Sequence, residues 1–154
     1  QRLVAAAQEA AQLAQGDVVS AKMTFNGLIR ESRSRPVLCG AYLGLGDCQV
    51  KELGNSKTPE GLREALENYL RAVILQFPAE GDPKDAHQTA HLNAAKCAED
   101  LMALANAKKD QKSVDGYRTI ARDLYQDLQS TYRGTDAARK AAEFSRRLAG
   151  AAAP

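Results

Sequence analysis

The chain of 154 residues is rich in helix-forming residues and poor in strand-forming ones. It contains 28 Ala and 17 Leu, but only 10 Val and Ile together, 3 Phe, 5 Tyr and no Trp. Ala and Leu favour helices, whereas β-branched and aromatic residues favour strands, so this composition excludes a β-sandwich, a β-barrel and a parallel-sheet fold. With 44% hydrophobic and 26% charged residues, we expect a folded all-α chain with one core.

The charge balance argues against nucleic acid as a partner. Lys and Arg number 21 and Asp and Glu 19, which gives a net charge of +2 without a basic arm or an acidic tail. We therefore expect no binding to nucleic acid.

No apolar stretch approaches the roughly 20 residues that span a bilayer, so we expect no membrane insertion. Because the first residue is Gln1 rather than Met, the sequence indicates a piece or a processed form of a longer protein.

Glycines, prolines and capping residues divide the chain into about seven predicted helices. These helices cover residues 2–15, 17–32, 36–53, 59–77, 83–107, 113–133 and 136–149. The connections are short, so neighbouring helices should be antiparallel. We expect a single domain over residues 1–150, followed by a linker or a frayed tail at 151–154.

The first and last predicted helices differ in their surfaces. Apolar residues, mostly Ala, cover about half of the helix at 2–15. This width favours a second contact, either with an earlier repeat or with another subunit, although the helix propensity of Ala alone gives the same pattern. The helix at 136–149 has one apolar stripe and a charged face, which is typical of a cap on a helical stack.

Three alternate helices share one spacing of small, aromatic and apolar residues. The three sets are Ala21, Phe25 and Leu28; Ala65, Tyr69 and Ala72; and Ala121, Tyr125 and Leu128. A small residue lets a neighbouring helix approach closely, and the ring fills the space beside it. The third and fifth helices share a fainter pattern, Leu45-Gly46-x-Cys48 and Ala94-Ala95-x-Cys97, and we expect Gly44 and Gly46 to serve close packing. The patterns predict repeated helix pairs; a non-repetitive bundle is the alternative.

With these motifs the chain resembles a degenerate member of the tetratricopeptide repeat family, most clearly in Arg63–Pro78, REALENYLRAVILQFP. The resemblance implies a short right-handed superhelix of stacked pairs, with approximate repeats 2–33, 36–78 and 83–133 and a capping helix at 136–149. The chain departs from the family in its period. The shared alanines are 44 and 56 residues apart (65 − 21 and 121 − 65), against about 34 in the family.

The resemblance implies a non-enzymatic module that binds a peptide or a partner protein in a groove, without a cofactor. The first helix of each pair lines that groove. We align Gly46 and Ala95 with the position that holds a small residue in the family's first helices. This alignment implies that two sets of four residues line the groove: Leu43, Asp47, Val50 and Lys51, and Leu92, Lys96, Glu99 and Asp100. The alternative is a segment of a larger scaffold, which continues or oligomerises through the N-terminal helix.

His87 and His91 are four residues apart, so both imidazoles lie on one face of a helix, as two zinc ligands would. A metalloprotease would need Glu after the first His, where this chain has Gln88, and Asp85 is the only third ligand nearby. We therefore rank a metal-dependent enzyme last and expect a histidine pair on the helix surface.

The three cysteines, Cys39, Cys48 and Cys97, are not spaced for zinc or thioredoxin-like chemistry. We expect small buried thiols that fill packing surfaces. Unpaired thiols favour a cytoplasmic location and leave a periplasmic one open.

Overall fold

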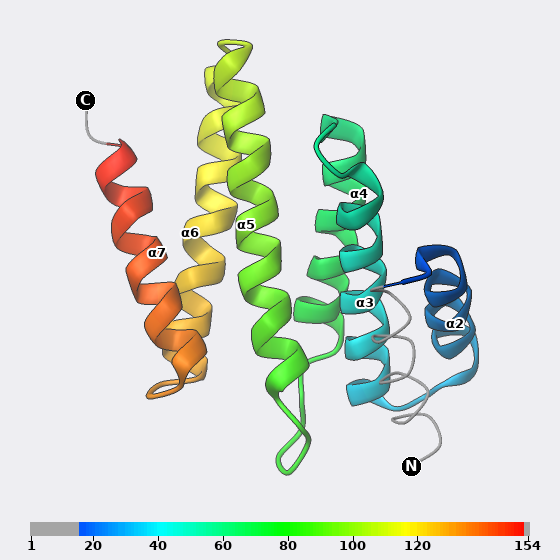
Figure 1. Cartoon of the computed structure of the whole chain (residues 1–154). Coiled ribbons are helices and arrows are strands. Elements are labelled where there is room, and N and C mark those ends of the chain that lie inside the picture. Colours follow the sequence, from blue (N-terminus) through cyan, green and yellow to red (C-terminus); the bar gives the residue numbers. More distant parts are fainter. Residues whose placement is uncertain (1–15, 153–154) are drawn as a thin grey trace. The chain divides into compact units, whose positions relative to one another are not determined.

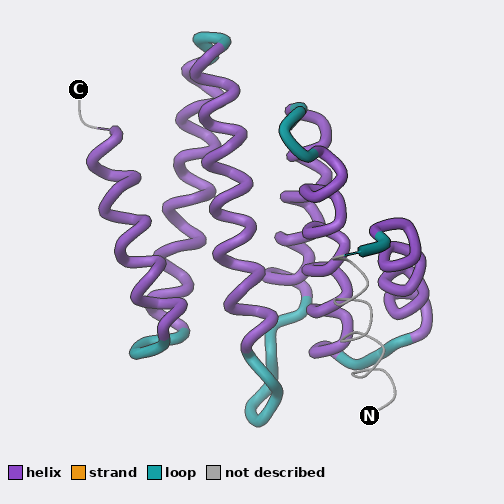
Figure 2. Tube along the Cα trace, viewed as in Figure 1, coloured by secondary structure: helices purple, strands orange, loops and turns teal. Residues whose placement is uncertain are grey.

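The described part of the chain is built from helices. The computed structural model describes residues 16–152, which contain six α-helices, one π-helical turn and no strand (Figures 1 and 2). The predicted all-α class is confirmed, and the predicted helix at 2–15 lies outside the described residues. None of the described helices is both long enough and apolar enough to cross a bilayer. The elements are α2 (Val18–Glu31), α3 (Arg35–Leu53), α4 (Pro59–Leu70), η1 (Arg71–Leu75), α5 (Asp85–Ala107), α6 (Gln111–Thr131) and α7 (Asp136–Ala152).

Short polar side chains set the beginnings of the helices. The Asp17 carboxylate accepts the Ser20 backbone N–H at 3.0 Å and caps α2. A second hydrogen bond, from the Ser20 hydroxyl at 2.6 Å, together with this backbone bond lowers the pKa of Asp17. Thr58 accepts the Gly61 N–H at 3.1 Å and caps α4, as its Thr-Pro signal predicts. Asp110 caps α6 in the same way, so α6 begins at residue 111 rather than 113. Each cap satisfies a backbone donor that the helix itself leaves unpaired.

The predicted helix at 59–77 leaves α geometry early. From Arg71 the chain forms the π-helical turn η1, and Phe77 lies beyond it. Two carbonyls of this turn accept hydrogen bonds from side chains: the Cys39 thiol lies 3.7 Å from Ala72 O, and His87 Nε2 lies 2.7 Å from Val73 O. Glycine and proline, which mark the ends of helices in a sequence, do not mark this turn. It depends instead on side chains from other parts of the chain, which satisfy its carbonyls.

The last helix is longer than predicted. It extends to Ala152 rather than ending at 149, so the predicted linker begins inside a helix. One Gly costs about 1 kcal/mol in a helix interior, and the Ala residues that follow Gly150 favour the helix most.

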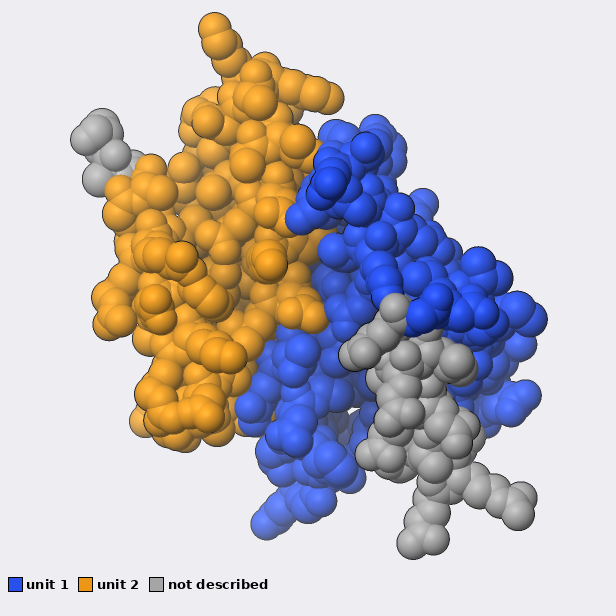
Figure 3. All heavy atoms as spheres, in the orientation of Figure 1, with its two compact units in different colours: residues 1–90 blue, residues 91–154 orange. Residues whose placement is uncertain are grey.

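The chain divides into two compact units, residues 1–90 and 91–154, and the division falls within α5 (Figure 3). In unit 1, α3 contacts both α2 and α4. A core of buried residues joins α2 to α3: Ala21, Phe25, Leu28, Val37, Ala41, Leu45 and Cys48. In unit 2, α6 packs against α7.

Two glycines of α3 admit aromatic rings from both neighbouring helices. A Cβ built at Gly44 would overlap the ring of Phe25 from α2, and one at Gly46 would overlap the ring of Tyr69 from α4. The predicted role of these glycines in close packing is confirmed. Because these two glycines lie on different sides of α3, a helix that presents an aromatic ring can pack closely against each side.

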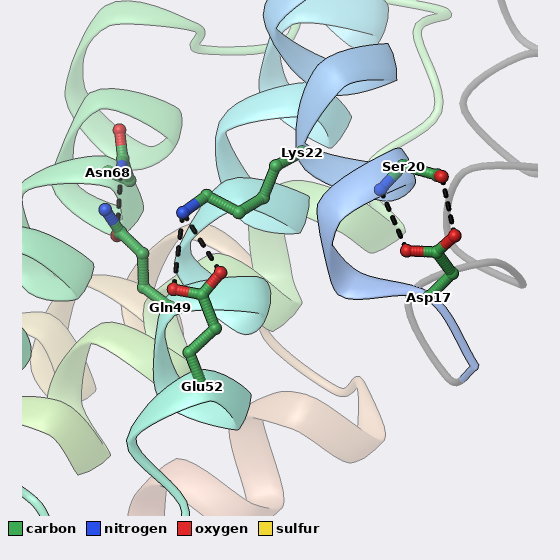
Figure 4. A network of polar contacts seen from close by, with 6 residues as sticks. All are labelled: Asp17, Ser20, Lys22, Gln49, Glu52 and Asn68. Atoms are coloured by element: carbon green, nitrogen blue, oxygen red, sulfur yellow. Dashed lines mark hydrogen bonds and ion pairs between the residues drawn. The ribbon is translucent and has the colours of Figure 1, made fainter.

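Polar side chains also link α3 to its neighbours, as Figure 4 shows. Lys22 of α2 lies 3.1 Å from the Glu52 carboxylate, and Asn68 of α4 donates to Gln49 Oε1 at 2.9 Å. The ion pair is partly exposed, so we expect it to contribute at most about 1 kcal/mol.

The nine residues of the three predicted small–aromatic–apolar faces are all buried, with exposed fractions of 5% or less: Ala21, Phe25, Leu28, Ala65, Tyr69, Ala72, Ala121, Tyr125 and Leu128. The spacing therefore predicted the packed face of α2, of α4 with η1, and of α6 correctly.

Candidate functional site

Unit 2 contains a groove of about 700 Å³, which we call the α5–α7 groove. Tyr125 of α6 forms part of its lining. The helix α5 contributes Leu92, Asn93, Lys96, Glu99, Asp100 and Met102, and α7 contributes Lys140, Phe144, Arg147, Leu148 and Ala151. Its volume falls in the range of roughly 300–1,000 Å³ that is typical of binding pockets.

The lining follows the helical period. On α7, Lys140, Phe144, Arg147 and Ala151 are separated by four, three and four residues, which places them on one face. From Lys140 to Ala151 this face extends about 16 Å at 1.5 Å per residue. The site is therefore an elongated groove along the helix rather than a point-like pocket.

A hydrogen bond from Tyr125 joins α6 to α5 within the lining of the groove. Its side chain is buried, and its hydroxyl donates to Glu99 Oε2 at 2.5 Å. Burial, followed by this hydrogen bond and the charge of Glu99, raises the pKa of Tyr125, while Arg147 acts in the opposite direction. The phenol therefore stays protonated at neutral pH and holds Glu99 in place as its acceptor.

Phe144 is the aromatic residue that α7 contributes. Its ring centroid lies 5.8 Å from that of Tyr125, and the Arg147 guanidinium carbon lies 4.5 Å from the centroid of Phe144. The ring is half-buried, so part of it remains available to a ligand. Aromatic and arginine side chains are the residue types that are enriched at protein interfaces.

Three cations line the groove without a carboxylate partner within 4 Å among residues 16–152: Lys96, Lys140 and Arg147. All three are exposed. They can interact with a negatively charged ligand without first breaking an internal ion pair.

The four residues predicted on the fifth helix, Leu92, Lys96, Glu99 and Asp100, all line this groove. The four predicted on the third helix belong to unit 1 and are not part of its lining: Leu43, Asp47, Val50 and Lys51. Of these, Asp47 accepts a hydrogen bond from the Tyr69 hydroxyl at 2.7 Å.

The α7 lining was missed from the sequence because the last helix was interpreted only as a cap. Phe144 lies on the apolar stripe of this helix, and Lys140 and Arg147 lie four residues before and three residues after it. This cation–aromatic–cation spacing on one helical face is the signal that could have identified the groove.

The same kind of tyrosine–carboxylate hydrogen bond occurs in each unit. Tyr69 donates to Asp47 in unit 1, and Tyr125 donates to Glu99 in unit 2. Asp47 directly follows Gly46, whereas Glu99 comes four residues after Ala95. The acceptor on α5 therefore lies about one turn further along than the alignment of Gly46 with Ala95 predicts.

The prediction that the two histidines form a pair on the helix surface is wrong. His87 and His91 are only 1% and 3% exposed. The His87 ring packs edge-on against Phe77 at 5.0 Å, and that of His91 packs against Tyr132 at 6.3 Å. Burial lowers the pKa of His87. Both imidazoles therefore fill space beside aromatic rings, which their spacing alone does not reveal, and residues 16–152 contain no cluster of three or more potential metal ligands.

The cysteine prediction is confirmed. Cys39, Cys48 and Cys97 are free and buried. Burial raises the pKa of the Cys39 thiol to about 11 and also raises that of Cys48. The thiols of Cys39 and Cys48 are therefore protonated at neutral pH and are poor nucleophiles.

Comparison with known proteins adds no relative. No protein-family model, curated protein or solved structure matches the chain. The resemblance to tetratricopeptide repeats therefore rests on the motifs of this chain alone.

Proposed function

We propose that the chain is a non-enzymatic protein-interaction module, which binds a peptide or a segment of a partner protein in the α5–α7 groove. The observation that carries this proposal is the lining itself. Phe144, Leu92 and Met102 are partly exposed apolar side chains in this lining, and cations without a carboxylate partner lie beside them. An apolar groove with a few placed polar groups is the usual form of a peptide-binding site.

A tetratricopeptide-like stack is the arrangement that we propose for the helices. In it, α3 with α4 and α5 with α6 are pairs, and α7 takes the place of the next first helix. The buried alanine–aromatic faces and the tyrosine–carboxylate bond of each pair support this assignment. In a stack of this kind the first helices line the binding surface, and the fact that α5 and α7 line the groove supports this assignment.

The proposal is tested by selecting peptides from a random display library on the whole chain and measuring their affinity by fluorescence anisotropy. We expect Phe144→Ala to weaken binding about tenfold or more, because a buried aromatic anchor contributes at least ~1–2 kcal/mol. The matched control is Phe77→Ala, which removes a phenylalanine that is 52% exposed and outside the groove. A failure to select any binder, or equal effects of the two variants, would overturn the proposal.

A second candidate function is that of a segment in a larger helical scaffold. Val19 and Met23, one turn apart on α2, are 68% and 70% exposed. Two large apolar side chains on one helical face favour contact with a further helix. Sedimentation velocity tests this candidate: self-association that Val19→Ser with Met23→Ser abolishes would support it, and a monomer at all concentrations would count against it.

A further inference from the structure

The charges that the α5–α7 groove offers to a ligand are mostly positive. Lys140 and Arg147 are the charged residues that α7 contributes to the lining, and α5 adds Lys96. Lys140 and Arg147 are seven residues apart on one face, which corresponds to about 10 Å along the helix. They form a row of two positive charges beside the exposed part of Phe144.

The negative charges of the lining are engaged within the protein. Glu99 accepts the Tyr125 hydroxyl at 2.5 Å, and Asp100 also has an interaction of its own. Breaking the Glu99 bond would leave the buried tyrosine without its acceptor, which is costly. A positively charged ligand meets two carboxylates, one of which already accepts the Tyr125 hydroxyl, whereas an acidic ligand meets three cations that have no carboxylate partner within 4 Å among residues 16–152.

The lining suits a helical ligand, which needs no partner for its backbone. Helical side chains form its whole described surface, and no strand edge is present in residues 16–152 to pair with an extended backbone. A helix satisfies its own backbone donors and acceptors and presents only side chains. Acidic residues seven apart on such a helix would match the spacing of Lys140 and Arg147.

From the charge complementarity and the spacing together, we propose that the occupant of the α5–α7 groove is an amphipathic helix of a partner protein with acidic residues beside its apolar stripe. This inference rests on the proposed function, because it names the chemistry of the ligand for the same site. The apolar stripe contacts Phe144 and Leu92, and the carboxylates face Lys140 and Arg147.

Two display libraries with the same helical apolar pattern test this proposal on the whole chain. One library carries Glu, Asp and Ala at the flanking positions, and the other carries Lys, Arg and Ala. We expect binders from the acidic library only, with helical circular dichroism in the complex and an affinity that falls as salt is raised.

Charge reversal in the protein supplies the matched control. Arg147→Glu and Lys140→Glu should each weaken an acidic binder about fivefold to tenfold, since an exposed pair is worth up to ~1 kcal/mol and reversal adds repulsion. Arg146→Glu makes the same change one residue away, on an exposed position outside the lining. It should change the affinity by less than about twofold. Thermal unfolding of all three variants checks that each remains folded.

The other outcomes separate this proposal from the proposed function. Binders that come from the basic library and weaken with Phe144→Ala would overturn the acidic partner and leave the groove as a peptide site. Acidic binders that bind in a non-helical form, or that lose as much affinity with Arg146→Glu as with Arg147→Glu, would overturn the proposal in the same way. Binders that do not respond to Phe144→Ala would overturn both.

Discussion

The ring of Phe25 on α2 occupies the space where a side chain at Gly44 on α3 would begin. A Cβ at Gly44 would overlap several ring carbons, and Phe25 is only 1% exposed, so the ring has little room to move. This contact fixes how closely α2 and α3 approach. It also explains why α3 keeps a glycine in its interior, where glycine costs about 1 kcal/mol relative to alanine.

We predict that Gly44→Ala destabilises the protein. The added methyl group forces the ring or the helix to shift, and overpacking of this kind costs about 1–3 kcal/mol, which exceeds the gain in helix propensity. Urea unfolding followed by circular dichroism measures the change.

Gly40→Ala is the control for this prediction. Gly40 lies in the same helix, and no atom lies within 4 Å of a Cβ placed there. We expect this variant to be more stable by about 0.5–1 kcal/mol. If both substitutions stabilise the protein equally, the ring does not set the distance between the two helices.

We predict that removing the Tyr125 hydroxyl weakens unit 2. Tyr125→Phe leaves the Glu99 carboxylate without its donor, and a hydrogen bond to a charged group contributes about 1.5–3 kcal/mol. Tyr69→Phe removes the corresponding bond to Asp47 and should have a similar effect. A loss below about 0.5 kcal/mol in both variants would show that solvent replaces the bonds.

The raised pKa of Tyr125 leads to a second, spectroscopic prediction. The folded state holds the protonated phenol, so the stability that it contributes is present below about pH 10 and is lost as the pH rises through the folded pKa. In ultraviolet difference spectra, part of the tyrosine absorbance change should therefore occur well above pH 10. This late phase should be smaller by one tyrosine in Tyr125→Phe; a wild-type titration in one phase near pH 10 would contradict the assignment.

His87 should make the protein less stable in mild acid. Burial lowers its folded pKa below the ordinary value of 6.5. As the pH falls below 6.5, the unfolded chain takes up a proton that the folded chain resists, so the free energy of unfolding decreases by up to about 1.4 kcal/mol per pH unit until the folded pKa is reached.

The comparison that isolates this effect is His87→Gln. Glutamine can still donate to Val73 O but does not titrate. Unfolding free energies of both proteins at about pH 7.5 and pH 5 should show a shallower decrease for the variant. Equal decreases would assign the acid sensitivity to other groups.

The native thiols should resist alkylation. All three cysteines are buried, and burial raises the pKa of Cys39 to about 11. Because the thiolate is the reactive form, iodoacetamide at about pH 8 should modify the native chain very slowly. Three additions in urea, counted by mass spectrometry, are the control. Rapid addition to the native chain would show that the thiols open to solvent readily.

The sequence predicted those features that depend on local pattern. The alanine–aromatic spacing identified the buried faces of α2, α4 and α6, and Thr58-Pro59 marked the start of α4. These succeed because helical period and capping are properties of a few neighbouring residues.

The features that the sequence missed depend on residues far apart in the chain. The turn η1 is held by Cys39 and His87, which lie 33 and 14 residues from the carbonyls that they contact. The burial of His87 and His91 depends on rings from other segments. The sequence also does not reveal the α7 side of the groove. Lys140 and Phe144 line a groove only because tertiary packing brings α7 close to Tyr125 and α5.

The most direct test of a ligand site in the α5–α7 groove is a ¹H–¹⁵N NMR titration of the whole chain with a selected acidic peptide. We predict that the amide shifts concentrate on the lining of α5 and α7, around Lys96, Phe144 and Arg147, and that Arg147→Glu reduces them while Arg146→Glu does not. Shifts confined to residues outside this lining, or identical titrations for the two variants, would contradict the account.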